Sequence, residues 1–277
     1  MSICAGIVLY NPDIDRLKEN IEAIISQVGS VVLVDNGSDN LAEIRTLIQG
    51  FDSRLHIMAQ GENKGIAAAL NKILKYSSDN EYQWVITLDQ DSVCPENIIK
   101  EYNKYIHLDD VAMIASRVVD RNANKLEDVS GDELQYLDRC ITSATLNRVS
   151  ALLDVGGFDE RLFIDFVDYD MCTRLRLKGY KIARHNGVKL LHEIGKSKDV
   201  KLFGRSFVVY NHSPMRRYYY TRNVLYYMKK YKEHINYKKE RNDFIVRTML
   251  VIIYEKNKWK NLKSIFKGIR DYKKLLA

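Results

Sequence analysis

Residues 84–92 read Trp-Val-Ile-Thr-Leu-Asp-Gln-Asp-Ser, a short apolar run that ends in two carboxylates, Asp89 and Asp91. An apolar run of this length with polar residues behind it is typical of a buried strand in a parallel sheet. In open α/β sheets, ligands bind beyond the carboxyl ends of the strands. The stretch therefore predicts both a central strand and a ligand site at its end.

The spacing of Asp89 and Asp91 indicates what that ligand would be. Residues two apart on an extended chain project to the same side, and like charges held so close repel each other. A divalent cation that carries a diphosphate would relieve the repulsion, because hard cations bind carboxylate and phosphate oxygens together. The alternative is an acidic turn that caps a helix near Pro95. An Asp-x-Asp pair alone favours the acidic turn, so the choice between a metal site and a turn depends on the other motifs of the chain.

Strands and helices alternate around this stretch. Apolar runs predict strands at 3–10, 31–34 and 55–58, and helical spacing predicts helices at 13–28, 41–49 and 66–76. Such alternation is typical of a doubly wound, mostly parallel α/β sheet with flanking helices.

The second half of the chain has a less regular pattern. Strands are expected at 111–116 and 140–146, with a polar loop at 120–138 between them, and a helix should run from Asp168 to Gly179. A hairpin-like pair of strands, 180–183 and 188–191, is expected around Asn186-Gly187.

Polar residues follow several predicted strands. Asp35 ends the second strand, where a carboxylate could accept from a base or ribose, and Gly65 at a helix mouth would let backbone approach a ligand. Both also suit ordinary turns.

Asp168 lies at a helix N-terminus, where the helix dipole favours the ionised form that a general base needs. The alternative is that Asp168 and the nearby Asp170 only cap the helix, and for Asp170 this role is favoured. His192 follows a predicted strand and enters a loop, so its side chain could contact a metal ion or a phosphate.

Composition narrows the class of protein. The chain of 277 residues is 46% hydrophobic and 29% charged, as an ordinary globular protein is. Its four cysteines lack metal-site spacing, so buried, reduced thiols in a cytoplasmic protein are expected. No signal peptide and no apolar run long enough to span a membrane are recognised.

Charge is distributed unevenly along the chain. Residues 1–195 hold 21 Lys and Arg against 30 Asp and Glu, whereas residues 196–277 hold 22 against 6. We expect a catalytic domain at 1–204 and a basic helical region at 205–277. Ile265, Ile269 and Tyr272 with interspersed lysines predict a basic amphipathic helix that lies on an anionic membrane, although a solvated charged face on a helix packed against the body is the alternative. A nucleic-acid partner is not expected, because the body of the chain is acidic.

Taken together, these stretches resemble the inverting family 2 nucleotide-sugar glycosyltransferases with a GT-A fold, and especially their bacterial rhamnosyltransferase branch. The resemblance covers residues 3–231. It rests on the sequences Ile7-Val-Leu-Tyr-Asn-Pro12, Val34-Asp-Asn-Gly-Ser38, Asn63-Lys-Gly-Ile-Ala67, Leu88-Asp-Gln-Asp-Ser92, Gly156-Gly-Phe-Asp-Glu160, Asp168-Tyr-Asp-Met-Cys172, His192 and Arg216-Arg-Tyr-Tyr219 with Arg222-Asn223.

The resemblance implies roles for individual residues. Asp168 would be the general base, Asp91 would bind Mn²⁺ or Mg²⁺, and His192 would help to hold the metal or diphosphate. Residues that the resemblance places around the nucleotide-sugar donor are Tyr10, Asn11, Asp35, Asn36, Gly65, Asp89, Gln90, Arg216 and Arg222. The sequence departs from the family at Val167, where a Glu is usual, and at Asn36, where an Asp is usual. The first departure leaves Asp165 and Asp170 open as alternative bases.

The resemblance also implies the reaction. The donor would be dTDP-rhamnose, or alternatively a UDP-sugar, and the acceptor a lipid-linked or cell-surface glycan at the inner face of the cell membrane. A nucleotide-binding module without sugar transfer is the alternative from another class. It would not require Asp168.

Overall fold

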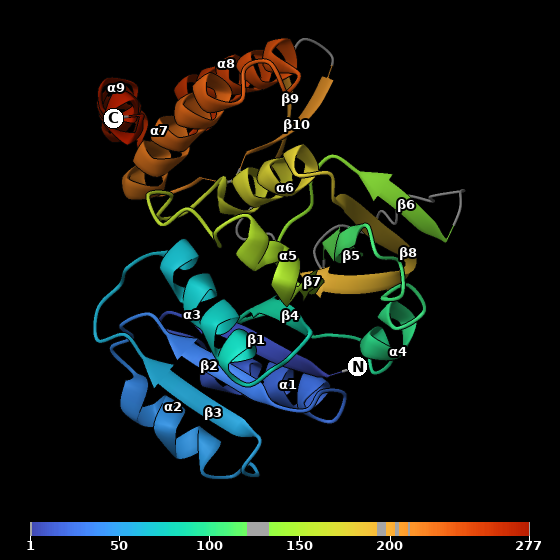
Figure 1. Cartoon of the computed structure of the whole chain (residues 1–277). Coiled ribbons are helices and arrows are strands. Elements are labelled where there is room, and N and C mark those ends of the chain that lie inside the picture. The colour runs from blue at the N-terminus through green and yellow to red at the C-terminus, as the bar shows by residue number, and fades with distance from the viewer. Residues whose placement is uncertain (1, 121–132, 193–197, 203–204, 210, 277) are drawn as a thin grey trace. The chain divides into compact units, whose positions relative to one another are not determined.

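The computed structural model describes residues 2–120, 133–192, 198–202, 205–209 and 211–276. The chain forms two compact units, coloured by residue number in Figure 1. Unit 1 comprises Met1–Glu160 and Val167–Glu193, and unit 2 comprises Arg161–Phe166 and Ile194–Ala277. The chain thus passes into unit 2 for six residues, returns to unit 1, and leaves it again near residue 193.

Unit 1 is built on one eight-stranded sheet with the order β3-β2-β1-β4-β7-β5-β8-β6. Neighbouring strands are parallel except where β7 and β6 pair with their neighbours. This mostly parallel sheet confirms the predicted α/β fold. The strands are β1 (Ile3–Leu9), β2 (Val31–Asp35), β3 (Leu55–Ala59), β4 (Trp84–Asp89), β5 (Val111–Asp120), β6 (Leu134–Leu137), β7 (Thr145–Arg148) and β8 (Lys181–His192).

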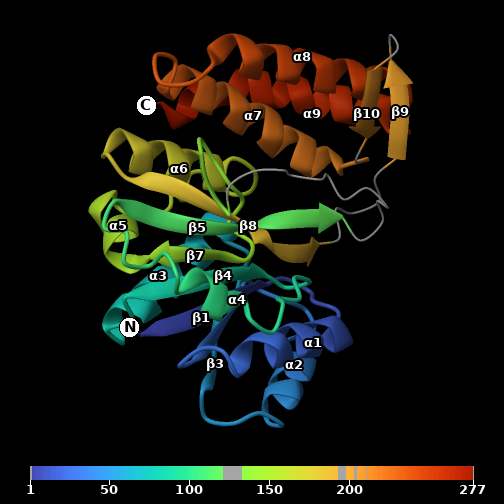
Figure 2. The same ribbon diagram turned by 90° about the vertical axis from the view of Figure 1, so that its right-hand side faces the viewer.

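Helices cover both faces of the sheet (Figures 1 and 2). Alternate strand residues pack into a core that includes side chains of α1 (Ile14–Ile25), α2 (Leu41–Ile48) and α4 (Ile98–Tyr102). The other face meets α3 (Ile66–Asp79), where the Cys4 thiol contacts Ser77 Oγ at 3.1 Å. Both faces are apolar because both are covered, as the unbroken apolar strand sequences required.

Two further helices follow β7 in the chain. They are α5 (Val149–Asp154) and α6 (Val167–Leu177). The prediction of a helix from Asp168 is confirmed, whereas α5 had not been predicted. Its six residues are too few to display helical periodicity in the sequence.

The predicted hairpin at 180–191 is wrong. The segment forms a single strand, β8, whose two halves both pair in parallel with β5. The register shifts between the pairs Ser116–His185 and Arg117–Lys189, so Asn186-Gly187 lies in a bulge instead of a turn. Pairing with β5 on both sides of the bulge keeps the strand continuous.

The boundaries of β7 also differ from the prediction. The strand begins at Thr145, not at Cys140, because the preceding residues turn. Ala144 has a φ of 52°, and the Thr145 hydroxyl donates to the Ile141 carbonyl at 2.7 Å. The predicted polar loop at 120–138 contains β6, and its residues 121–132 lie outside the described part of the chain.

Unit 2 contains a helical bundle and a strand pair. The basic helical C-terminal region is confirmed, with α7 (Pro214–Lys230), α8 (Tyr237–Tyr254), α9 (Lys258–Asp271) and a 3₁₀ helix, η1 (Tyr272–Leu275). Figure 2 shows α7, α8 and α9 beside one another. The hairpin of β9 (Lys198–Leu202) and β10 (Arg205–Val209) packs against α8 through Val200, Val209 and Leu250.

The segment Arg161–Phe166 belongs to unit 2 because its aromatic side chains pack on α7. Phe163 stacks on Tyr219 with ring centroids 4.7 Å apart, and Phe166 lies 5.3 Å from Tyr227. No helix in the described ranges is long and apolar enough to cross a membrane.

A buried ion pair joins α7 to the end of α8. Arg217 pairs with Glu255, and both side chains are almost fully buried. The second carboxylate oxygen of Glu255 accepts from Asn261 Nδ2 at 2.6 Å. Because a charge buried without its partner is costly, this pair fixes how the helices of unit 2 pack.

Replacing Glu255 with Gln should therefore destabilise unit 2 by about 3 kcal/mol, since Arg217 would remain buried without a counter-charge. Urea unfolding followed by circular dichroism measures the loss. Glu233→Gln is the matched control, because Glu233 forms an exposed pair with Lys232 that should contribute less than about 1 kcal/mol. Equal stability of the two variants would contradict a structural role for the buried pair.

Candidate active site

Three parallel strands end side by side at one edge of the sheet of unit 1. In the register of the sheet, Leu9 lies opposite Asp35, and Val8 lies opposite Asp89. The loops that follow are tied to one another. The Tyr10 backbone N–H donates to Gln90 Oε1 at 2.8 Å, so the ends of β1 and β4 form one continuous surface.

The loop after β1 is also joined to the loop after β2. The Asn11 backbone N–H donates to Ser38 Oγ at 2.8 Å, and Asn11 Oδ1 accepts from the Asp39 backbone N–H at 2.7 Å. Asn11 has a φ of 48°, a left-handed conformation that Asn tolerates better than most residues. The side chain of Tyr10 is about half exposed beside it.

Asp35 is fully buried at the end of β2. Its carboxylate accepts from the backbone N–H groups of Gly37 at 3.1 Å and Ser38 at 3.2 Å. Gly37 has a φ of 83°, and a Cβ there would lie 2.7 Å from the backbone of Glu62, so only glycine fits. The carboxylate of Asp35 thus shapes the turn around the strand end.

Asn36 holds a second loop against that strand end. Its Oδ1 accepts from Gln60 Nε2 at 2.8 Å and from the Lys64 backbone N–H at 2.9 Å, and its Nδ2 donates to Asn63 Oδ1 at 3.0 Å. An Asp in this place could not donate to Asn63. Gly65 follows with a φ of 89° and opens α3, whose first backbone N–H groups form a favourable place for an anion.

The backbone of the Asp-Gln-Asp stretch is fixed from two sides. The Asp89 carbonyl accepts from Asn20 Nδ2 of α1 at 2.8 Å and from the Ser92 backbone N–H at 3.1 Å. The hydroxyls of Ser92 and Ser143 lie 2.7 Å apart. The side chains of Asp89 and Asp91 are only partly buried.

The donor set of this stretch fits a hard divalent cation. Two carboxylates supply oxygen ligands, which Mg²⁺ and Mn²⁺ prefer, and they leave the remaining coordination positions to phosphate oxygens and water. A transition ion that requires nitrogen or sulfur ligands would be less well served.

Asp168 lies in the first turn of α6, partly exposed. Its Oδ1 accepts from the Tyr169 backbone N–H at 2.9 Å. The hydrogen bond to Cys172, burial and, less strongly, the charge of Asp168 raise the pKa of the Cys140 thiol well above its usual range. The start of α6 packs against the residues before β7, because the Arg139 guanidinium lies 4.2 Å from the centroid of the Tyr169 ring and the Cys172 thiol lies 3.8 Å from the Cys140 carbonyl. The same segment contains the Ser143 that contacts Ser92.

The other two candidate bases are in different surroundings. Asp170 is fully buried and paired with Arg174, whose Nε lies 2.7 Å from its Oδ2. Asp165 belongs to unit 2 and accepts from Arg216 at 3.1 Å. A general base must be reached by the acceptor and must take up a proton. Of the three carboxylates, Asp168 has the surroundings that suit this role best.

The remaining predicted site residues lie elsewhere. His192 is the last residue of β8, opposite Asp120 in β5, and its side chain is outside what the structure describes. Arg216 and Arg222 belong to unit 2. Arg222 donates to the Arg161 carbonyl at 2.6 Å and lies 4.8 Å from the centroid of the Tyr219 ring.

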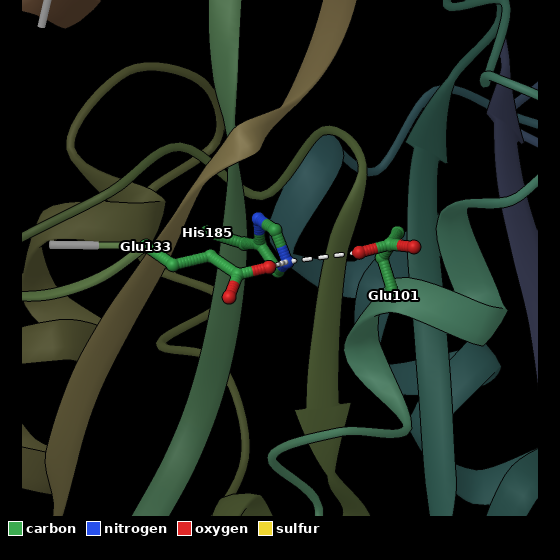
Figure 3. A group of neighbouring side chains, drawn as sticks. All are labelled: Glu101, Glu133 and His185. Carbon is green, nitrogen blue, oxygen red and sulfur yellow. Dashed lines mark ion pairs between the residues drawn. The ribbon is translucent and has the colours of Figure 1, made fainter.

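A carboxylate and histidine cluster is formed by Glu101 of α4, Glu133 just before β6 and His185 of β8. The strand β8 is three strands away from β4 in the sheet, or about 14 Å at the usual strand spacing. Figure 3 shows Glu101 and Glu133 on either side of the buried His185, whose Nε2 is 3.3 Å from an oxygen of each. Together the three could provide ligands to a metal ion.

The hydrogen bonds of this cluster favour an ion-pair network over a metal site. The Gly187 backbone N–H donates to His185 Nδ1 at 3.1 Å, so a neutral ring carries its proton on Nε2, the atom that a metal would need. Lys104 Nζ already lies 2.6 Å from Glu101 and 3.1 Å from Glu133. It lowers the pKa of both carboxyl groups.

Several residues that position the site were not predicted. Asn20, Gln60 and Ser143 all bond to the strand-end loops. Asn20 gave a usable signal, because it is a polar residue beside Leu17, Ile21 and Ile24 on the apolar face of α1. Gln60 and Ser143 lie in loops, where polar residues are ordinary and give no such signal.

Comparison with known proteins gives consistent results. The family described as "Glycosyl transferase family 2" matches residues 4–163, more than half of the chain. The dTDP-rhamnosyl transferase RfbF of Shigella flexneri is 29% identical over 286 aligned residues, which cover 95% of this chain and 92% of that protein.

Solved structures resemble the chain in fold. The mannosyltransferase PcManGT of Pyrobaculum calidifontis, in complex with GDP-Man and Mn²⁺, matches with a TM-score of 0.61 and 14% identity over 99% of this chain and 78% of that one. S. aureus TarS 1–349 in complex with UDP-GlcNAc matches with a TM-score of 0.57 and 14% identity over 98% and 80%. These neighbours have the GT-A fold that the sequence predicted.

Proposed function

The chain belongs to glycosyl transferase family 2, and we propose that it transfers L-rhamnose from dTDP-rhamnose to a glycan acceptor, with inversion at the anomeric carbon and with Mn²⁺ or Mg²⁺. That it is a glycosyltransferase follows from the family. The sugar, the metal requirement and the roles of individual residues are the proposal.

One observation supports the proposed reaction above all others. The ends of β1, β2 and β4 are joined into one surface that carries Asp89 and Asp91, and the segment 139–145 contacts both this surface, through Ser143, and the start of α6, through Arg139 and Cys140. A paired carboxylate site and a separate, partly exposed Asp168 are what an inverting transfer needs, because leaving group and acceptor lie on opposite faces of the sugar.

The donor half of the site would hold the nucleotide diphosphate. Asp91, with Asp89, would bind the metal ion, which neutralises charge on the leaving diphosphate when it is bound. Tyr10 and Asn11 would surround the nucleoside, beside the turn that the buried Asp35 holds in place, with Asn36 keeping the Gly65 loop in place. Gln90, Arg216 and Arg222 complete the set of donor-binding residues proposed from the family resemblance, and His192 would help to hold the metal or the diphosphate.

The acceptor half would depend on Asp168. Its carboxylate would accept the proton of the acceptor hydroxyl as the oxygen attacks the anomeric carbon, while the bond to the diphosphate breaks. A single displacement inverts the centre and needs no covalent intermediate. The proton ends on Asp168 and the electron pair of the broken bond on the diphosphate.

Rhamnose is proposed because the curated relative that aligns with nearly the whole chain is a dTDP-rhamnosyl transferase. A UDP-sugar is the second candidate, since S. aureus TarS was solved with UDP-GlcNAc and has the same fold. The acceptor would be a lipid-linked or growing cell-surface glycan, reached at the inner face of the cell membrane through the basic helices of unit 2.

A panel of nucleotide sugars tests the proposal. Binding and slow hydrolysis of dTDP-rhamnose, UDP-glucose, UDP-GlcNAc and GDP-mannose are measured with Mn²⁺ or Mg²⁺ and again with EDTA. We expect selection of dTDP-rhamnose, lost on chelation by about tenfold or more. Metal-dependent selection of a UDP-sugar would overturn the rhamnose assignment and keep the mechanism. Donor binding without turnover on any acceptor extract would favour the nucleotide-binding module.

A further inference from the structure

The helix α9 presents an apolar face on the surface of unit 2. Trp259 is 85% exposed and Phe266, two turns further along, is 69% exposed. Leu262 and Ile269 lie between and beyond them at intervals of three and four residues, so the four side chains share one side of the helix. These four residues are called the α9 face below.

The rest of α9 is fixed by packing, so the α9 face is not needed to hold the helix in place. Asn261, Ile265 and Gly268 are buried on another side of α9. The prediction that Ile265 shares a membrane-facing side with Ile269 is therefore wrong, because Ile265 packs inside unit 2. A Cβ at Gly268 would lie 2.9 Å from the Thr221 Cβ and the Tyr218 carbonyl of α7, which shows how closely the two helices approach. Large aromatic side chains left in water on a packed helix carry a cost that a binding partner would remove.

The charges around the α9 face select the partner. Residues 256–270 contain six basic residues and no acidic one. The nearest carboxylates are engaged within unit 2, because Glu255 pairs with Arg217, and Lys274 and Arg270 lie 3.0 and 3.2 Å from Asp271. Lys256, Lys260 and Lys263 are exposed beside the apolar residues.

We propose that the α9 face binds the headgroup region of an anionic lipid bilayer, with Trp259 and Phe266 inserted at the boundary of the acyl chains and the lysines on lipid phosphates. Tryptophan and phenylalanine on one side of a helix, with lysine along its flank, are the composition of helices that lie in the plane of a membrane surface. Each lysine near such a surface contributes about 1 kcal/mol, and the contribution depends on lipid charge.

This inference rests on the proposed function in one respect, namely that the glycan acceptor is reached at a membrane surface. It concerns unit 2 alone, and it is measured without any donor or acceptor. Failure of membrane binding would therefore leave glycosyl transfer intact, and failure of transfer would leave membrane binding intact.

The test is cosedimentation of the full chain with two kinds of vesicle, phosphatidylcholine alone and phosphatidylcholine mixed with phosphatidylglycerol. We expect binding to the mixed vesicles only. Trp259→Ser with Phe266→Ser should weaken it by roughly 30-fold, the equivalent of about 2 kcal/mol of lost apolar burial. The triple variant Lys256→Gln, Lys260→Gln and Lys263→Gln should also weaken vesicle binding, and the loss of binding should be larger at low salt than at high salt.

Two controls make the result specific. Leu153→Ser removes an apolar side chain of α5 in unit 1 that is also about half exposed, and it should not change vesicle binding. Hydrolysis of a soluble nucleotide sugar should be unchanged in the Trp259 and Phe266 variant, which shows that the protein is folded.

Three outcomes would overturn the proposal. One is equal binding of the wild type and the α9 variants to mixed vesicles, and another is the absence of binding to either kind of vesicle. The third is salt-sensitive binding of single-stranded nucleic acid that the same lysine substitutions remove, which would identify a different polyanion as the partner.

Discussion

Replacing Asp168 with Asn should lower the rate of sugar transfer about a thousandfold while donor binding changes little. Asn retains the shape of the side chain and can still accept from the Tyr169 backbone N–H, but it cannot take a proton from the acceptor. Transfer to acceptor is measured at saturating donor, and donor affinity is measured separately by calorimetry with Mg²⁺ or Mn²⁺.

The neighbouring carboxylates provide the matched controls for this experiment. Asp170→Asn breaks the buried pair with Arg174 and should appear as a loss of stability, and Asp165→Asn should leave the rate within about tenfold. If Asp168→Asn transfers at a normal rate while Asp165→Asn does not, the base is Asp165. If the Asp168 variant loses donor binding to the same degree as activity, the base assignment fails.

Replacing Asp91 with Asn should weaken metal-dependent donor binding about a hundredfold. A neutral amide is a poor ligand for a divalent ion that carries a diphosphate, and the loss corresponds to about 3 kcal/mol of electrostatic stabilisation. Titration of dTDP-rhamnose at several concentrations of Mn²⁺ measures it. Adding EDTA should then weaken binding to the wild type and have little further effect on the variant.

Asp79→Asn is the control for the charge change, because Asp79 is exposed at the end of α3 and pairs with Lys75, one turn earlier on the same helix. It should bind donor as the wild type does. If Asp91→Asn kept full metal-dependent affinity, the acidic turn would be structural, and the metal would have to be held elsewhere.

The sequence was most informative where burial is local and complete. The apolar runs that became β1, β2 and β4 are covered on both faces, so their composition alone identified them as strands of a parallel sheet. The same runs placed Asp35, Asp89 and Asp91 at one edge. The helix predicted at 13–28 also begins where expected, because Asp13 caps α1 by accepting from the Arg16 backbone N–H at 3.0 Å.

The sequence was least informative where structure depends on distant contacts. Asn186-Gly187 is a common turn signal, yet β5 pairs with residues on both sides of it and keeps the strand continuous. Similarly, nothing local separates Arg161–Phe166 from the flanking residues of unit 1. Only the rings of α7, more than fifty positions later, determine where Phe163 and Phe166 pack.

That brief passage of the chain through unit 2 has a consequence for how such a protein can be recombined. Joining unit 1 to a different carboxyl-terminal part by a single crossover after residue 193 would leave Phe163 and Phe166 without the α7 rings on which they stack. Phe166 directly precedes α6 and lies two residues before Asp168. Exchange of the carboxyl-terminal part thus needs a compensating change in the middle of the gene, so we expect the two regions to be inherited together.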